Sequence, residues 1–316
     1  MGNEMSAEEI SEIRRKNKSI LMRRFASYVK AGPDLRVNRN IVMFTSLSSS
    51  DNLRRHYERR RVELGDHAAD WTKSLVEKLS GLTAAPELAG LGALAIAVLI
   101  DIVSSSPPEE STKEALRGVF AEQKASEVWD HIDECLKRCR MNINSRDDLK
   151  SDIKRIEYQL SAALTRLKNA MVRDGHMTSD GLRAWVNGAA FHVQMLIHLV
   201  RLGGTQTCDS VETLISTYES ELSLLFTKHQ EMIEDKCHVI SRLNESNGPA
   251  IGYFRFMVDE ESEWHDLDDE CDYEEFFKAF YEYRYSGQKS EIEEYFCDVR
   301  GNLQNLVRQR GSFSVM

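Results

Sequence analysis

The first six residues, Met-Gly-Asn-Glu-Met-Ser, have the spacing that an N-myristoyltransferase recognises. Removal of Met1 exposes Gly2, and Ser6 stands where the pattern requires Ser or Thr. The expected chemistry is an amide bond between the amino group of Gly2 and a C14 fatty acid. A single myristoyl chain holds a protein to a bilayer only marginally, so stable attachment requires a second signal.

Basic side chains follow this motif and are candidates for the second signal, because each cation contributes about 1 kcal/mol near an anionic leaflet. A second basic cluster lies in the stretch "RRHYERRR", where a solvated face paired with neighbouring acids is the alternative interpretation. No aromatic platform for nucleic acid accompanies these arginines. The candidate membrane-binding residues are Arg14, Arg15, Lys16, Lys18, Arg23, Arg24, Arg54, Arg55, Arg59, Arg60 and Arg61.

Residue types that bind metals or act as nucleophiles are present, but their spacing predicts no such site. Cys135 and Cys139 are one helical turn apart, yet no second Cys or His pair has ligand spacing, so buried thiols are expected. His192 and His198 are six residues apart and fall on different faces of a helix. No linear catalytic motif occurs. We expect a non-catalytic protein without a cofactor or metal, and an enzyme of unrecognised type stays open.

The charge is unevenly distributed along the chain. The formal net charge is -10, but residues 259–275 alone contain 11 acidic residues and no basic one. An EF-hand loop requires a glycine that this stretch lacks. We therefore expect a solvated acidic surface, or one that docks on a basic surface. The acidic balance argues against a general nucleic-acid binder.

Helices must position these groups, because apolar residues recur at intervals of three and four and only five prolines occur in 316 residues. The predicted fold class is all-α: a bundle of long amphipathic helices with a smaller helical, acidic C-terminal region. The first helix should begin at Ser6, with Glu9 completing a capping box, and end at Gly32. A second helix should begin near Ser50, and a third at Ser111, which can form a capping box with Glu114.

An apolar tract spans residues 82–103. It holds 13 consecutive uncharged residues from Leu88 to Ile100 before Asp101 interrupts it. A membrane-spanning helix needs about 20 apolar residues, so a short core helix is one interpretation and conditional membrane insertion is another. Nucleotide binding by its G-x-G-x-x-A pattern is disfavoured because no strand is expected before it. The membrane-insertion candidates are Leu91, Leu94, Ile96, Val98 and Leu99.

The clearest heptad pattern follows the third helix and covers three heptads of coiled-coil spacing. It is a candidate surface for self-association if the bundle does not use it internally. Its residues are Leu149, Ile153, Ile156, Leu160, Ala163, Leu167 and Met171.

Two further helices are expected before a boundary. Residues 182–202 are apolar nearly all round, which is typical of a helix buried on most sides. Residues 209–244 contain no Pro or Gly and predict one long helix, and Asn247-Gly248-Pro249 then breaks the chain. The expected domains are residues 1–32 with the myristoylation signal and basic helix, the bundle at 33–247, and the acidic, aromatic-rich region at 248–316.

These observations favour an N-myristoylated peripheral membrane protein that acts by helical self-association or partner binding at an anionic membrane surface. Its expected partners are that surface and a protein or a second copy, with no nucleic acid and no small-molecule substrate. The first 20 residues are charged where a signal peptide is apolar, which favours the cytoplasmic face of a membrane. The alternative is an α-helical membrane-permeabilising protein that inserts the tract at 82–103.

Overall fold

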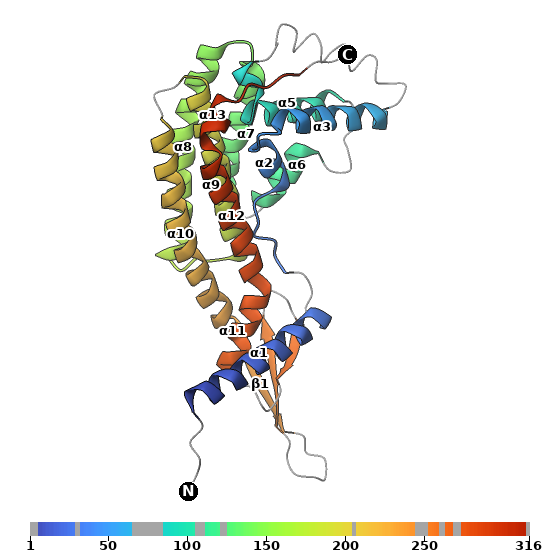
Figure 1. Ribbon diagram of the computed structural model, residues 1–316, viewed down its shortest axis with the longest axis vertical. Coiled ribbons are helices and arrows are strands. Elements are labelled where there is room, and N and C mark those ends of the chain that lie inside the picture. Colours follow the sequence, from blue (N-terminus) through green and yellow to red (C-terminus); the bar gives the residue numbers. More distant parts are fainter. Residues whose placement is uncertain are drawn as a thin grey trace. The chain divides into compact units, whose positions relative to one another are not determined.

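The structure, a computed structural model, describes residues 6–28, 32–64, 85–104, 111–120, 125–203, 207–243, 252–258, 263–267 and 273–313 (Figure 1). Helices account for most of them, and the predicted all-α bundle is confirmed. The chain forms two compact units. The smaller unit is Met1–Asp34 with Phe226–Glu291, and the larger is Leu35–Leu225 with Ile292–Met316. This division differs from the expected boundaries at 32 and 247 because segments far apart in sequence form one unit.

Long helices that surround α9 form the core of the larger unit (Figure 1). The α9 side chains Trp185 and Phe191 are fully buried, as the all-round apolar pattern predicts. α7 packs on α8 and α8 packs on α9. The helices are α7 (Ser126–Met141), α8 (Arg146–Val172), α9 (Ser179–Arg201), α10 (Cys208–Asp235), α12 (Gly287–Gly301) and α13 (Leu303–Arg308), of which α10 and α12 continue into the smaller unit.

Shorter elements complete the larger unit. They are α2 (Arg39–Phe44), α3 (Ser49–Leu64), η2 (Pro86–Leu88), α5 (Leu91–Val103), α6 (Thr112–Arg117) and η3 (Gly118–Phe120). The Ser111 Oγ accepts a hydrogen bond from the backbone N–H of Glu114 at 3.2 Å, so the predicted cap is confirmed. The helix that begins there, α6, ends at Arg117, and η3 and α7 follow it as separate elements. Gly118, a poor helix former, stands at the break.

The smaller unit combines helices with a three-stranded antiparallel sheet of order β1-β2-β3. Val239 pairs with Phe256, which pairs in turn with His265. The elements are α1 (Ala7–Tyr28), β1 (Cys237–Leu243), β2 (Gly252–Val258), β3 (Glu263–Leu267), α11 (Tyr273–Tyr281) and the single π-helical turn η5 (Glu282–Ser286), together with parts of α10 and α12.

The sheet corrects two expectations. The helix predicted to reach residue 244 is wrong beyond Asp235, because β1 begins at Cys237. Val239 and Ile240 are β-branched and suit a strand. Within the acidic stretch 259–275, β3 replaces the expected helical structure, while residues 259–262 and 268–272 lie outside the described residues.

Candidate membrane-binding surface

The basic helix α1 uses its apolar side inside the smaller unit. The Phe25 ring packs edge-on against Phe276 and Phe280 of α11, with ring centroids 5.3 and 5.8 Å apart. Phe25 is fully buried and Leu21 is nearly so. These contacts cover Leu21 and Phe25, whereas Ile20 is 46% exposed at the edge of the polar side of α1.

The polar side of α1 carries exposed cations. Arg15, Lys16 and Arg23 fall within an arc of roughly 100° on the helix, and all three are exposed. Lys18 is also exposed, but it lies at the flank, where its Nζ is 2.5 Å from the Glu282 carboxylate. The Arg14 and Arg24 side chains lie outside the described residues, as does Gly2, whereas Ser6 is exposed immediately before α1.

Two acids lie on the same side of α1. Glu8 and Glu12 are exposed in the first half of the helix. The cations follow from Arg15 onward, so the positive charge is concentrated in the middle and second half of the helix rather than spread over all of it. A surface of this kind attracts anions over about a Debye length, roughly 8 Å at physiological salt.

The second basic helix, α3, divides its arginines between surface and core. Arg54, Arg55, Arg59 and Arg61 are exposed, but Arg60 is only 3% exposed. Arg60 therefore does not belong to the exposed cations with which it was grouped. The reason is rotation along the helix, because neighbouring residues point about 100° apart.

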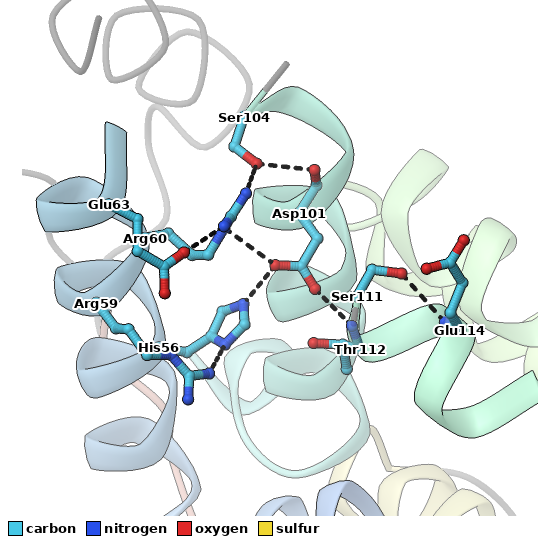
Figure 2. A network of polar contacts seen from close by, with 9 residues as sticks. All are labelled: His56, Arg59, Arg60, Glu63, Asp101, Ser104, Ser111, Thr112 and Glu114. Carbon is cyan, nitrogen blue, oxygen red and sulfur yellow. Dashed lines mark hydrogen bonds and ion pairs between the residues drawn. The ribbon is translucent and has the colours of Figure 1, made fainter. Parts of the chain in front are cut away.

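Arg60 is buried against a carboxylate that the apolar tract supplies (Figure 2). The Asp101 Oδ1 lies 2.9 Å from the His56 Nε2 and 3.6 Å from the Arg60 Nε. The backbone N–H of Thr112 donates to the other oxygen, Oδ2, at 2.8 Å. The acid that interrupts the tract thus joins α3, α5 and α6. Burying it is tolerable because every contact opposes its negative charge.

The hydrogen bonds fix the tautomer of His56. An Arg59 NH2 group, which can only donate, lies 3.0 Å from the His56 Nδ1. Nδ1 is therefore the acceptor, and the Nε2–H donates to Asp101. Arg60 NH2 donates to the Ser104 Oγ at 2.6 Å, and Arg60 also pairs with Glu63.

The electrostatics of Asp101 follow from these contacts. Burial alone would raise its pKa, but the hydrogen bonds from the His56 Nε2–H and from Thr112 outweigh it. The pKa of the Asp101 carboxyl is therefore lowered from its usual value. Ser104 donates its hydroxyl proton to the backbone carbonyl of Asp101 at 2.9 Å. Because that proton is used there, Ser104 is not arranged as a nucleophile beside His56.

Polar contacts also hold the other end of α5. Gly90 has φ +60°, which favours glycine, and its N–H donates to the Ser49 Oγ at 3.1 Å. Arg201 of α9 donates to the backbone carbonyls of Ala89 at 2.9 Å and Leu306 at 2.7 Å. Ser49 pairs with Gly90 and Arg60 with Ser104, so α3 and α5 run parallel.

The charge states at this end follow from burial. Desolvation lowers the pKa of Arg201 to about 10, so the guanidinium remains charged at neutral pH. Burial and the neighbouring Arg201 hold the pKa of His198 well below its usual value. The neutral His198 accepts from Arg201 through Nδ1 at 2.9 Å.

The membrane-insertion candidates lie inside the larger unit. Leu91, Leu94, Ile96 and Val98 are fully buried, and Leu99 is half-buried. α5 is a core helix in this structure, which agrees with the first of the two interpretations of the tract. Residues 82–84 at its start lie outside the described residues. Among the helices of the described residues, none has the length and apolar content to cross a bilayer.

The heptad residues of α8 are also used internally. Leu149, Ile153, Ile156, Leu160, Ala163, Leu167 and Met171 are all buried. α7 and α9 pack against α8. Beside this seam, His192 Nε2 lies 2.8 Å from Glu157 and Nδ1 lies 2.5 Å from the Tyr218 hydroxyl. Self-association through the seam would require this packing to open.

Sequence reasoning did not identify the contacts of Asp101. A signal was present, because a lone acid inside an apolar helix requires a buried donor or cation. The sequence pattern identified His56 and Arg60 only as parts of a basic cluster, not as partners of Asp101. Within the described part of the chain, no group of three or more His, Cys, Asp or Glu side chains is arranged to hold a metal ion.

Comparisons with models of known protein families, with curated proteins and with solved structures find no match to this chain.

Proposed function

We propose that this protein is an N-myristoylated peripheral membrane protein that binds anionic membranes through α1 and acts without catalysis, by binding a partner or a second copy there. The observation that supports the proposal best is the side of α1 that carries Arg15, Lys16 and Arg23. It is exposed and follows the Gly2 motif within about five helical turns.

The energetics require both signals. A myristoyl chain alone gives a partition constant on the order of 10⁴ M⁻¹. Three cations near an anionic leaflet contribute about 1 kcal/mol each, which multiplies that constant roughly 100-fold. The combination gives stable but reversible attachment, whereas either signal alone is weak.

The packing of α1 specifies how the helix would bind. An interfacial amphipathic helix buries its apolar side in the lipid, but the apolar residues Leu21 and Phe25 are already buried in the smaller unit. We therefore propose that α1 contacts headgroups through its charges, with Ile20 as its one described exposed large apolar side chain, while the fatty acid enters the hydrocarbon. Binding of this kind should weaken steeply with ionic strength.

Vesicle co-sedimentation tests the proposal directly. The protein is made with an N-myristoyltransferase and compared with Gly2→Ala on vesicles of 30% phosphatidylserine in phosphatidylcholine, and on phosphatidylcholine alone. The acylated protein should sediment with the anionic vesicles at 100 mM salt and be released at 500 mM. Gly2→Ala should bind at least tenfold more weakly. The proposal fails if intact-mass measurement shows no acyl group and the protein stays in the supernatant.

Insertion of α5 is the alternative function, and the polar contacts at both of its ends argue against it. Leaving the unit would separate Asp101 from His56 and Arg60, and Ala89 from Arg201. Dye-loaded vesicles of the same composition distinguish the two functions. Binding without leakage favours peripheral attachment, whereas leakage that Leu94→Asp abolishes while binding persists favours insertion.

The partner-binding part of the proposal cannot use the α8 seam in its packed state, because α7 and α9 already contact it. A partner or second copy would instead bind another exposed surface. Light scattering after size-exclusion chromatography, with and without vesicles of known size, measures whether copies associate. A strict monomer in both conditions leaves a different protein as the partner.

A further inference from the structure

Ser19 occupies a distinctive place on α1. It is exposed, and it lies within the arc that holds Arg15, Lys16 and Arg23. Those three cations are at positions i-4, i-3 and i+4 from Ser19. Side chains with these spacings are neighbours on a helix surface.

The sequence before Ser19 is also basic. Residues 14–18 read Arg-Arg-Lys-Asn-Lys, so cations stand one, three, four and five residues before the hydroxyl. A kinase with an acidic substrate groove would bind such a segment by charge complementarity. No acidic residue lies between Ile13 and Ser19 to oppose that binding.

We infer that Ser19 is a phosphorylation site for a basophilic serine/threonine kinase, and that its phosphate switches off the membrane-binding side of α1. This inference rests on the proposed membrane function. It adds the means of release, because a lipid-anchored protein with a constant basic helix has no chemical control of its own.

The chemistry is phosphoryl transfer from ATP. The Ser19 Oγ forms a bond to the γ-phosphorus while the bond from that phosphorus to the bridging β-γ oxygen breaks, and ADP leaves. The hydroxyl proton passes to the kinase's general base and then to solvent. A phosphatase reverses the change by hydrolysis, in which water supplies the oxygen of the released phosphate.

The charge change is large relative to the site. A phosphoserine carries about -1.5 to -2 charges at pH 7. It would therefore offset most of the charge of the three neighbouring cations and pair with them along the helix. Two elementary charges near an anionic leaflet correspond to roughly 10- to 30-fold weaker binding. Because the myristoyl chain alone binds marginally, this loss is enough to release the protein.

The packing of α1 makes the modification compatible with the fold. Ser19 points about 120° away from Phe25, which contacts α11, around the axis of the helix. A phosphate there stays in solvent and places no charge in the aromatic contacts of the smaller unit. The switch would thus act on the surface charge and leave the helix in position.

The test installs phosphoserine at position 19 by genetic-code expansion in the full-length myristoylated chain. The matched control carries phosphoserine at Ser220, an exposed position on α10 in the larger unit. Both proteins are measured on vesicles of 30% phosphatidylserine in phosphatidylcholine at 100 mM salt, with circular dichroism as the check of helix content.

The expected result is 10- to 30-fold weaker binding for phosphoserine 19 and less than threefold for phosphoserine 220. Equal losses, or no loss at position 19 in a chain whose unmodified form binds, overturn the inference but leave the proposed function intact. Failure of the unmodified chain to bind overturns the proposed function itself, and the switch with it.

A second arm examines the kinase step on the unmodified full-length protein. It is incubated with ATP and the catalytic subunit of a panel of basophilic kinases, beside Ser19→Ala, and phosphopeptides are mapped by mass spectrometry. Phosphate at Ser19 that the substitution removes supports the inference. Phosphate only at other residues, or none, overturns the assignment of Ser19.

Discussion

α1 and α3 are both arginine-rich helices, and the structure gives their cations different roles. On α1 the cations Arg15, Lys16 and Arg23 are exposed while Leu21 and Phe25 are buried. On α3 one cation, Arg60, is buried and contacts Asp101 in the core. The density of positive charge in a sequence therefore does not distinguish a surface for a partner from a contact that holds the fold together.

The distinguishing feature lies elsewhere in the chain. α3 packs against an apolar helix that contains a carboxylate, whereas α1 packs against aromatic rings. A buried acid recruits a cation from the neighbouring helix, because leaving it alone in the core is costly. An uncharged aromatic ring needs no cation to neutralise it, so the exposed cations of α1 remain at the surface.

The largest expected effect compares one arginine from each helix. Arg60→Gln should lower the free energy of unfolding by about 3 to 5 kcal/mol, because it removes one partner of a buried ion pair. Arg23→Gln should change it by less than about 0.5 kcal/mol, as exposed substitutions do. Urea unfolding followed by circular dichroism measures both. Similar losses for the two variants would show that the proposed division of roles does not hold.

Substitutions in α1 should reduce membrane affinity more than substitutions in α3, which is the reverse of their expected effects on stability. Substituting Arg15, Lys16 and Arg23 together by Gln should weaken binding of the acylated protein to anionic vesicles roughly 100-fold. The matched triple of Arg54, Arg55 and Arg61 should weaken it about tenfold or less, because exposed acids intersperse α3 and Arg55 bonds to Asn52. A larger loss for the α3 triple would make α3 the principal binding helix.

The dependence of stability on acidic pH tests the role of the buried Asp101, which Arg60 of α3 contacts. The pKa of Asp101 is lower in the folded than in the unfolded protein, so its contribution to stability is present above the unfolded pKa, about 3.9. That contribution is lost as pH falls through the folded pKa, by up to about 1.4 kcal/mol per pH unit. The stability gap between wild type and Asp101→Asn should thus narrow below about pH 4. A gap that widens in acid would contradict the assigned charge state.

The smallest expected effect concerns the ion pair of α1. Lys18 and Glu282 are both about half-exposed, so solvent screens their attraction. Lys18→Gln should lower stability by about 0.5 kcal/mol or less, and 1 M salt should remove the difference. A loss comparable to that of Arg60→Gln would mean that α1 depends on its charges for position rather than on Phe25.

Patterns within one element were enough to predict much of the fold. Ser111 predicts a helix start from its own hydroxyl and the backbone three residues on, and the structure has that bond. The apolar residues around α9 predict burial on all sides, whatever the neighbours are. Such signals are local, and they survive because the tertiary structure does not oppose them.

The remainder depends on contacts between distant residues. Arg60 and Arg61 are adjacent and chemically identical, and only the position of Asp101, some 40 residues on, buries one of them. Likewise, the helix expected through residue 244 has no breaking residue, yet β1 pairs with β2 from Cys237 onward. The hydrogen-bonding partner of the β1 backbone is β2, and the sequence of β1 alone does not reveal it. The lipid at Gly2 and the role of Ser19 stay predictions.

The smaller unit combines two segments that are far apart in the sequence, Met1–Asp34 and Phe226–Glu291. At a translation rate of about 5 to 20 residues per second, Phe25 emerges from the ribosome about 10 to 50 s before Phe276, against which it packs edge-on. During that interval α11 is not available to pack against α1, so the apolar Phe25 and the charged side chains of α1 are exposed together. The nascent chain therefore exposes the Phe25 side of α1 until α11 has been synthesised.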